Sequence, residues 1–195
     1  MNEIARSITD YLIKKDIIAK GKRDIYVYGF KLILADIFNY VLIVAFGTII
    51  GKTIESILFL ITLYGLRQFC GGFHAKTFTV CRLSMIITYV SVIILSDSIG
   101  NMKSCVHVLF TLNFISIVFV SMFAPVEHPN KPLQKKQREM NKRKSIIMSV
   151  FVCFVSLALV IKDIESGVIM STTMTAVIIL MVVSMLLKKG GKKYA

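Results

Sequence analysis

Hydrophobic residues in this 195-residue chain are concentrated in six apolar runs, which polar segments separate. Most of the runs approach the ~20 residues that a transmembrane helix needs. The pattern therefore predicts an all-α, polytopic integral membrane protein that forms a single domain over residues 1–195. The six runs cover residues 32–50, 53–66, 79–96, 105–123, 146–162 and 168–187.

The second run is the shortest of the six. From Ile54 to Leu66 it would extend only ~20 Å as a helix, against a hydrocarbon core of ~30 Å. Such a segment can span a locally thinned bilayer, or it can be a broken or re-entrant helix. Either geometry allows the polar stretch that follows to lie below the membrane surface.

Residues 2–20 have an amphipathic pattern instead of a continuous apolar one. Ile4, Ile8 and Leu12 fall near one helical face, whereas Arg6 and Lys14 lie among the polar positions. We expect a helix that lies on the membrane surface and contacts lipid, within a cytoplasmic-face segment covering residues 1–31. A soluble helix that packs on the cytoplasmic loops is the alternative.

Charge then gives the orientation. The chain is 55% hydrophobic and carries a formal net charge of +13. The cations flank the apolar runs, so they indicate membrane orientation and not a nucleic-acid partner. With six spans, twenty of the 24 Lys and Arg residues fall on one side. We therefore assign both termini, the stretch at 67–78 and the basic loop at 124–145 to the cytoplasm.

The stretch from Arg67 to Cys81 contains His74 and two of the four cysteines. A neighbouring imidazole helps to form a thiolate, which is the reactive form of cysteine. On one straight helix the Cα atoms of His74 and Cys81 would stand ~10.5 Å apart, too far for a hydrogen bond. The Gly71-Gly72 pair allows a bend before His74, which places Cys81 in the first turns of the next helix. The helix N-terminus and neighbouring cations would lower the pKa of its thiol there.

Two alternatives involve Cys70. It precedes His74 by four residues, a spacing that would bring the two together on a helix, but the glycines disfavour a helix there. A metal site is conceivable from the ligand types of Cys70, His74, Cys81 and His128. Its spacing matches no common zinc pattern, so we expect no metal and no cofactor.

Four residues form the pattern Arg-(x)4-Gly-x-His-(x)6-Cys, namely Arg67, Gly72, His74 and Cys81. This pattern resembles the AgrB family of membrane cysteine endopeptidases, which process quorum-sensing propeptides in Gram-positive bacteria. Ala124-Pro125, followed by Lys131-Pro132, is a second match, and the likeness in length and hydropathy covers nearly the whole chain.

The resemblance implies a His–Cys dyad and an AgrD-like propeptide partner with an amphipathic leader and an acidic tail. Cleavage would proceed through an acyl-thioester on Cys81, and an internal thiol or hydroxyl of the peptide would then close a thiolactone or lactone. The resemblance also implies a homodimer in the cell membrane.

Other polar residues are candidates for supporting roles. Arg67 and Lys76 could hold the acidic region of the propeptide or stabilise the oxyanion, and Gln68 is a candidate oxyanion donor. The seven cations of the 124–145 loop offer a second dock for an acidic peptide. Orientation of the protein in the membrane explains most of that charge by itself.

Three of the polar residues inside apolar runs are candidates for a specific partner. A carboxylate at the depth of Asp36 is costly unless it is paired, so Asp36 or Asn39 could orient His74 or hold Arg67. The alternative is that Asp36 snorkels to the interface. Asn113, near the middle of the fourth run, is expected to hydrogen-bond another helix.

A small transporter or a non-enzymatic, peptide-binding membrane scaffold is the alternative functional class. A transporter predicts inverted-repeat hydropathy, with Gly- or Pro-broken helices at matching positions of two halves. The sequence has no such symmetry, and its only Gly-rich break is the His–Cys stretch. Replacing Cys81 separates the classes, because a peptidase needs this thiol and a transporter does not.

Overall fold

The computed structural model describes residues 2–71, 78–102, 104–126 and 134–190, and these residues are almost entirely helical. The all-α prediction is confirmed, and five of the helices (α2, α4, α5, α6 and α7) are long and apolar enough to cross a membrane. The helices are α1 (Asn2–Lys14), α2 (Arg23–Ile49), α3 (Thr53–Cys70), α4 (Phe78–Gly100), α5 (Cys105–Phe123), α6 (Lys135–Val160) and α7 (Ile164–Gly190), with a 3-10 turn, η1 (Lys20–Lys22), before α2.

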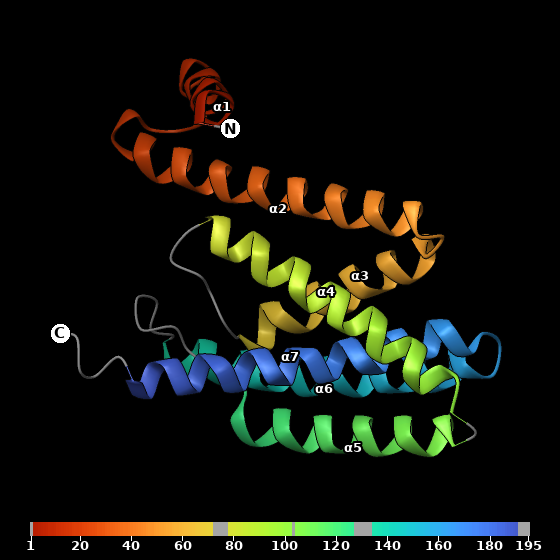
Figure 1. Cartoon of the computed structure of the whole chain (residues 1–195). Helices are drawn as coiled ribbons and strands as arrows, with labels where there is room; N and C mark the ends of the chain where they lie inside the picture. The colour runs from red at the N-terminus through yellow and green to blue at the C-terminus, as the bar shows by residue number, and fades with distance from the viewer. Residues whose placement is uncertain (1, 72–77, 103, 127–133, 191–195) are drawn as a thin grey trace.

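Helices α2 to α7 run back and forth across one bundle (Figure 1). The turns between α2 and α3, α4 and α5, and α6 and α7 lie together at what we call the far end. The last turn of α3 and the first turn of α4 lie at the opposite end, which we call the site end, together with the junction between α5 and α6.

The predicted short second span is α3. It is one continuous, unbroken helix of 18 residues, the shortest of the six from α2 to α7, and it is not among the five that are long and apolar enough to cross a membrane. Its length of ~27 Å at 1.5 Å per residue exceeds the ~20 Å expected from its apolar core alone. The difference arises because the helix continues through the polar residues Arg67 and Gln68 to Cys70.

Several helix ends differ from the ends of the apolar runs. The N-terminal helix stops at Lys14 and α2 begins at Arg23, so the second half of the 1–31 segment is largely part of the first span. Helix α6 begins at Lys135, so the second half of the basic 124–145 segment is helical and not a loop. Lys, Arg, Glu and Gln are good helix formers, but hydropathy marks only the apolar part of a helix.

An ion pair joins α1 to the beginning of α2. The Arg23 guanidinium donates from Nε to Asp10 Oδ1 at 2.7 Å and from Nη2 to Asp10 Oδ2 at 2.9 Å. This hydrogen-bonded pair lowers the pKa of the Asp10 carboxyl. Both side chains are largely exposed, so the pair adds little stability and mainly sets the direction of α1 relative to α2. In Figure 1, α1 accordingly turns away from the axis of α2.

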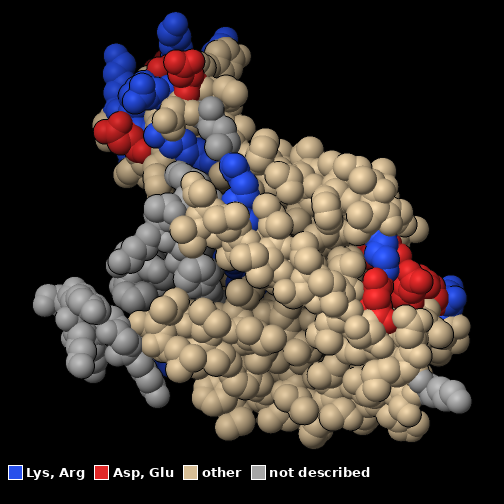
Figure 2. Space-filling model, viewed as in Figure 1, with Lys and Arg blue, Asp and Glu red and all other residues tan. Residues whose placement is uncertain are grey.

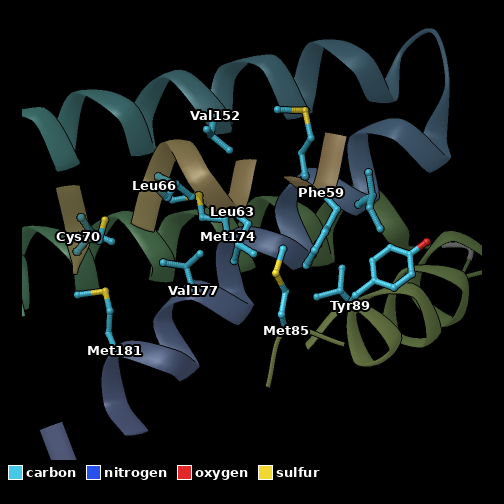
Figure 3. Close-up of a cluster of buried hydrophobic side chains, with 14 of the residues drawn as sticks. Phe59, Leu63, Leu66, Cys70, Met85, Tyr89, Val152, Met174, Val177 and Met181 are labelled. Carbon is cyan, nitrogen blue, oxygen red and sulfur yellow. The ribbon is translucent and has the colours of Figure 1, made fainter. Parts of the chain in front are cut away.

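Helix α7 is the centre of the bundle. Half of its apolar window is buried (50%), against 22% in each of the other four spans of this kind. In the main core, Met174, Val177 and Met181 of α7 lie close to Phe59 and Leu66 of α3 (Figure 3). A helix packed on several sides at once gives the bundle a fixed centre, against which α3 is held.

Polar side chains also cross-link the helices inside the bundle. Asn113 of α5 donates to Ser171 Oγ of α7 at 2.9 Å, which confirms the predicted bond between helices. Ser171 Oγ also lies 2.5 Å from Ser156 Oγ of α6, and Ser96 of α4 bonds Thr172 of α7 at 2.7 Å. These bonds fix the rotation of three neighbours around α7, because a hydroxyl in an apolar interior needs a partner.

Candidate functional site

Cys81 is the fourth residue of α4, at the site end of the bundle, and its side chain is half-buried. The prediction that it falls in the first turns of the helix after the glycine pair is confirmed. Backbone N–H groups at a helix N-terminus favour a negative charge, so this position supports a thiolate. His74, Gly72 and Lys76 lie outside the described residues, and the His74–Cys81 contact therefore stays a prediction.

The rival thiol, Cys70, has a different environment. It is the last residue of α3, it is fully buried, and it belongs to the main apolar core (Figure 3). Reactive cysteines are partly exposed and lie in electropositive surroundings, whereas cysteines buried in apolar surroundings are inert. Burial therefore separates the two thiols of the site stretch and favours Cys81.

Helix α2 holds the residue next to Cys81. Arg82 Nε donates to Asn39 Oδ1 at 3.3 Å, and Asn39 is only 5% exposed. The guanidinium carbon of Arg82 also lies 4.6 Å from the centroid of the Phe38 ring, a cation–π geometry. The sequence pointed to His74 or Arg67 as the partner of Asn39, and it gave no signal for Arg82.

Side chains from three helices converge on this region. Asp36 on α2 and Arg67 on α3 are near enough for their charges to interact, and the expectation that Asp36 holds Arg67 stays a prediction. Tyr40, one turn after Asp36, is within electrostatic range of both of them and of Cys81. Its ring packs edge-to-face on Tyr64, with the centroids 6.1 Å apart. The sequence gives no signal for either tyrosine, because an aromatic residue in an apolar run looks like an ordinary lipid-facing one.

Gln68, the candidate oxyanion donor, lies in the last turn of α3 beside Arg67, and its side chain is exposed. It is not part of the apolar core that encloses Cys70. Its distance from a reacting carbonyl is not defined by the described residues, and its role stays a prediction.

A backbone contact ties the end of α3 to the segment after α5. The N–H of Val126 donates to the carbonyl oxygen of Cys70 at 2.9 Å, and Gly71 and Val126 form an isolated parallel β-bridge. Gly71 has φ +74°, and the Ala124–Pro125 peptide bond is cis. Lys144 at the start of α6 adds a cation–π contact, with Nζ 5.5 Å from the centroid of the Phe69 ring.

The two segments of this contact were both visible in the sequence, as a glycine pair and an Ala-Pro pair. The sequence did not show that they pair with each other.

Among the residues that the structure describes, no group of three or more His, Cys, Asp or Glu side chains could hold a metal. Of the four conceivable ligands named above, His74 and His128 lie outside these residues.

Comparisons with known proteins show what this chain is similar to. The family described as accessory gene regulator B matches residues 5–188. A putative AgrB-like protein of Clostridium perfringens strain SM101 is 23% identical over 182 residues, which cover 86% of this chain and 85% of the relative. Protein FsrB of Enterococcus faecalis is 28% identical over 152 residues, covering 77% and 61%.

Accessory gene regulator protein B of Staphylococcus saprophyticus is 21% identical over 131 residues, covering 67% of this chain and 68% of that protein. No solved structure matches this chain. Because the family match extends over nearly the whole sequence of this multi-pass, all-α membrane protein, the chain belongs to the accessory gene regulator B family.

Proposed function

We propose that this protein is a membrane cysteine endopeptidase that removes the C-terminal region of a quorum-sensing propeptide and allows the remainder to cyclise. The observation that carries the proposal is the placement of Cys81: a half-buried thiol at a helix N-terminus, next to Arg82 and within the electrostatic range of Tyr40. Membership in the accessory gene regulator B family supports it independently.

The reaction assigns one role to each group of the dyad. His74 accepts the proton of the Cys81 thiol, and the thiolate attacks the scissile carbonyl of the propeptide. The C–N bond then breaks, and the departing amine takes the proton from the His74 imidazolium. The peptide is left as a thioester on Cys81. His74 then accepts the proton of an internal thiol or hydroxyl of the peptide, whose sulfur or oxygen attacks this thioester, closes the ring and expels the Cys81 thiolate.

Exchange of one thioester for another is nearly neutral in energy, so the acyl-enzyme has to be kept from water. Cys81 is half-buried in a helix bundle, with tyrosines from two helices nearby, which supports partial exclusion of solvent. Arg67 and Gln68 at the end of α3 are the proposed partners of the oxyanion or of an acidic substrate region. Lys76 is a third candidate for this role.

We place the site end at the cytoplasmic face. Lys and Arg side chains gather over α1 and the beginning of α2 at this end, and a largely uncharged belt separates them from an acidic patch at the far end (Figure 2). Cytoplasmic segments carry the excess of positive charge in membrane proteins. The basic residues at the start of α6 lie at the same end and form the proposed dock for the acidic tail of an AgrD-like propeptide. The homodimer expected from the family is part of the same proposal.

The test uses the full chain in lipid vesicles, mixed with its cognate propeptide. Mass spectrometry should detect a covalent peptide adduct on Cys81, and Cys81→Ala and His74→Ala should abolish cleavage while leaving membrane insertion and peptide binding intact. Cys153→Ala is the matched control, because Cys153 of α6 is also half-buried but lies away from the site. Cleavage by the Cys81→Ala protein at the wild-type rate would rule out the peptidase proposal and favour a transporter or scaffold.

A further inference from the structure

We propose that Gly71 and Val126 form a backbone clamp that positions the His74 segment against Cys81, so that both are positioning residues for the reaction. The inference rests on the proposed function, since it assigns the clamp a role in that dyad. It adds the Ala124–Val126 segment, far away in sequence, to the machinery of the site.

The clamp consists of main-chain atoms. Val126 N–H donates to the Cys70 carbonyl at 2.9 Å, and the bridge pairs Gly71 with Val126 in parallel. Cys70 is the last residue of α3, and a Gly71 N–H bond to the Arg67 carbonyl, 3.0 Å long, closes the helix. The segment after α5 thus sets the direction in which the chain leaves α3.

Only glycine fits at the first position of this bridge. The φ of +74° at Gly71 is in the region that L side chains rarely adopt. A Cβ atom placed there would lie 2.2 Å from the carbonyl oxygen of Val126 and 3.1 Å from its carbonyl carbon. Both contacts are with backbone atoms, which cannot rotate away. Any side chain at position 71 would therefore push the two segments apart.

The contacts around the clamp hold its neighbours in place, so a shift at Gly71 is passed on to the segment that follows it. On the α3 side, Cys70 is fully buried and Phe69 is held by the Lys144 contact, so α3 cannot shift easily. On the other side of residues 72–77, the bond from Arg82 to Asn39 holds the beginning of α4. The segment that carries His74 is therefore anchored at both ends by contacts with different helices.

A dyad is sensitive to small changes in this anchoring. A misplacement of ~1 Å of a catalytic group can cost about 100-fold in rate. Relief of a Cβ contact at 2.2 Å requires a shift of this size, because ordinary contacts begin near 3.4 Å. We therefore expect Gly71→Ala to lower the cleavage rate by about 100-fold.

A second measurement separates positioning from loss of folding. The rate of Cys81 alkylation at neutral pH reports how well His74 supports the thiolate, which is the reactive form. In Gly71→Ala this rate should fall toward that of His74→Ala, while the buried Cys70 stays as unreactive as in the wild type. Partial unfolding would instead speed the alkylation of Cys70.

Gly51→Ala is the matched control. Gly51 has nearly the same φ (+76°) and lies in the turn between α2 and α3 at the far end, but a Cβ there would meet nothing within 4 Å. The substitution places a Cβ at a positive φ without the contact, and it should keep the wild-type cleavage rate and alkylation rates. Val126→Pro tests the clamp from the other segment, because it removes the N–H that bonds Cys70. It should reproduce both effects of Gly71→Ala, and it serves if that protein does not fold.

The outcomes are distinguishable. If Cys81→Ala is inactive but Gly71→Ala and Val126→Pro keep the wild-type rates of cleavage and Cys81 alkylation, the clamp has no positioning role and only this inference is overturned. Equal damage in Gly51→Ala would also overturn it, because strain and not the Val126 contact would then explain the loss. Cleavage by Cys81→Ala would instead overturn the proposed function itself.

Discussion

Arg82 donates a hydrogen bond from Nε to Oδ1 of Asn39 at 3.3 Å, and this bond ties the beginning of α4 to the middle of α2. Arg82 directly follows the candidate nucleophile. Its contact with the Phe38 ring adds a second point of attachment on the same helix. The position of Cys81 therefore depends on α2 as well as on the loop that precedes it.

Replacing the buried partner tests this tie. Asn39→Leu leaves the Arg82 guanidinium without this acceptor, and hydrogen bonds to charged groups contribute ~1.5–3 kcal/mol. We expect a loss of about 1–3 kcal/mol in the free energy of unfolding, measured by denaturant titration in detergent micelles. Asn39→Asp keeps the acceptor and should retain most of the stability. The tie is unimportant if Asn39→Leu costs no more than Asn101→Leu, a change at an exposed site in the far-end turn.

The four cysteines should react with alkylating agents in the order of their exposure and environment. Cys81 is half-buried at a helix N-terminus, whereas Cys70 is fully buried in the apolar core. We expect Cys81 to be modified at least ~10-fold faster than Cys70 in the native protein at neutral pH, because the thiolate is the reactive form. Peptide mapping after short exposure to iodoacetamide gives both rates. Equal rates of modification of Cys81 and Cys70 in the native protein would contradict the burial argument.

The cross-link between α5 and α7 should show energetic coupling. Ser171→Ala removes the partner of both Asn113 and Ser156. Hydrogen bonds between membrane helices contribute ~0.6 kcal/mol on average and up to ~1.7, so the loss should fall near the upper value. Ser98→Ala is the control, because the exposed Ser98 hydroxyl bonds only its own helix at Ile94 O. A double-mutant cycle with Asn113→Ala measures the interaction free energy between Asn113 and Ser171. Strict additivity of the two losses would show that the bond contributes nothing to stability.

An ion pair at the far end predicts a loss of stability at alkaline pH. The Lys52 ammonium pairs with Asp97 at the edge of a cavity of about 220 Å³ that Glu55 and Glu165 also line. Burial by itself lowers the pKa of Lys52, but the hydrogen bond and charge of Asp97, with the two glutamates, raise it above its ordinary value. The pair therefore stabilises the fold below the unfolded-state pKa, and this stabilisation is lost as pH rises through the higher folded-state pKa.

Lys52→Met measures this contribution. The variant should be less stable than the wild type at pH 8, by up to ~1 kcal/mol, and the difference should disappear well above pH 10.5. Cleavage should be unaffected, since the pair lies at the end of the bundle opposite Cys81. Lys162→Met, at an exposed position in the α6–α7 turn of the same end, controls for the loss of one cation. A difference that persists at high pH would show that Lys52 acts through packing and not through its charge.

The chemistry of single residues was predictable only in part. The glycine pair before His74 correctly placed Cys81 at the beginning of α4, because two adjacent glycines disfavour a helix more strongly than a single one such as Gly65 inside α3. Asn113 was correctly expected to bond another helix, since an amide in an apolar interior needs a partner. The partner of Asn39 was not predictable. Arg82 and Arg67 are both cations, and only the packing of the helices decides which of them lies beside Asn39.

The sequence by itself determined that this chain is a bundle of membrane helices and where most of these helices lie. Backbone groups in lipid have to be satisfied within the segment, so a long apolar run has no alternative to a helix. The tertiary structure decided which faces are buried, which thiol is accessible, and that Gly71 meets Val126. Lipid tails are as apolar as a protein core, so a membrane helix that is apolar on all sides carries no pattern that shows which side its neighbours cover.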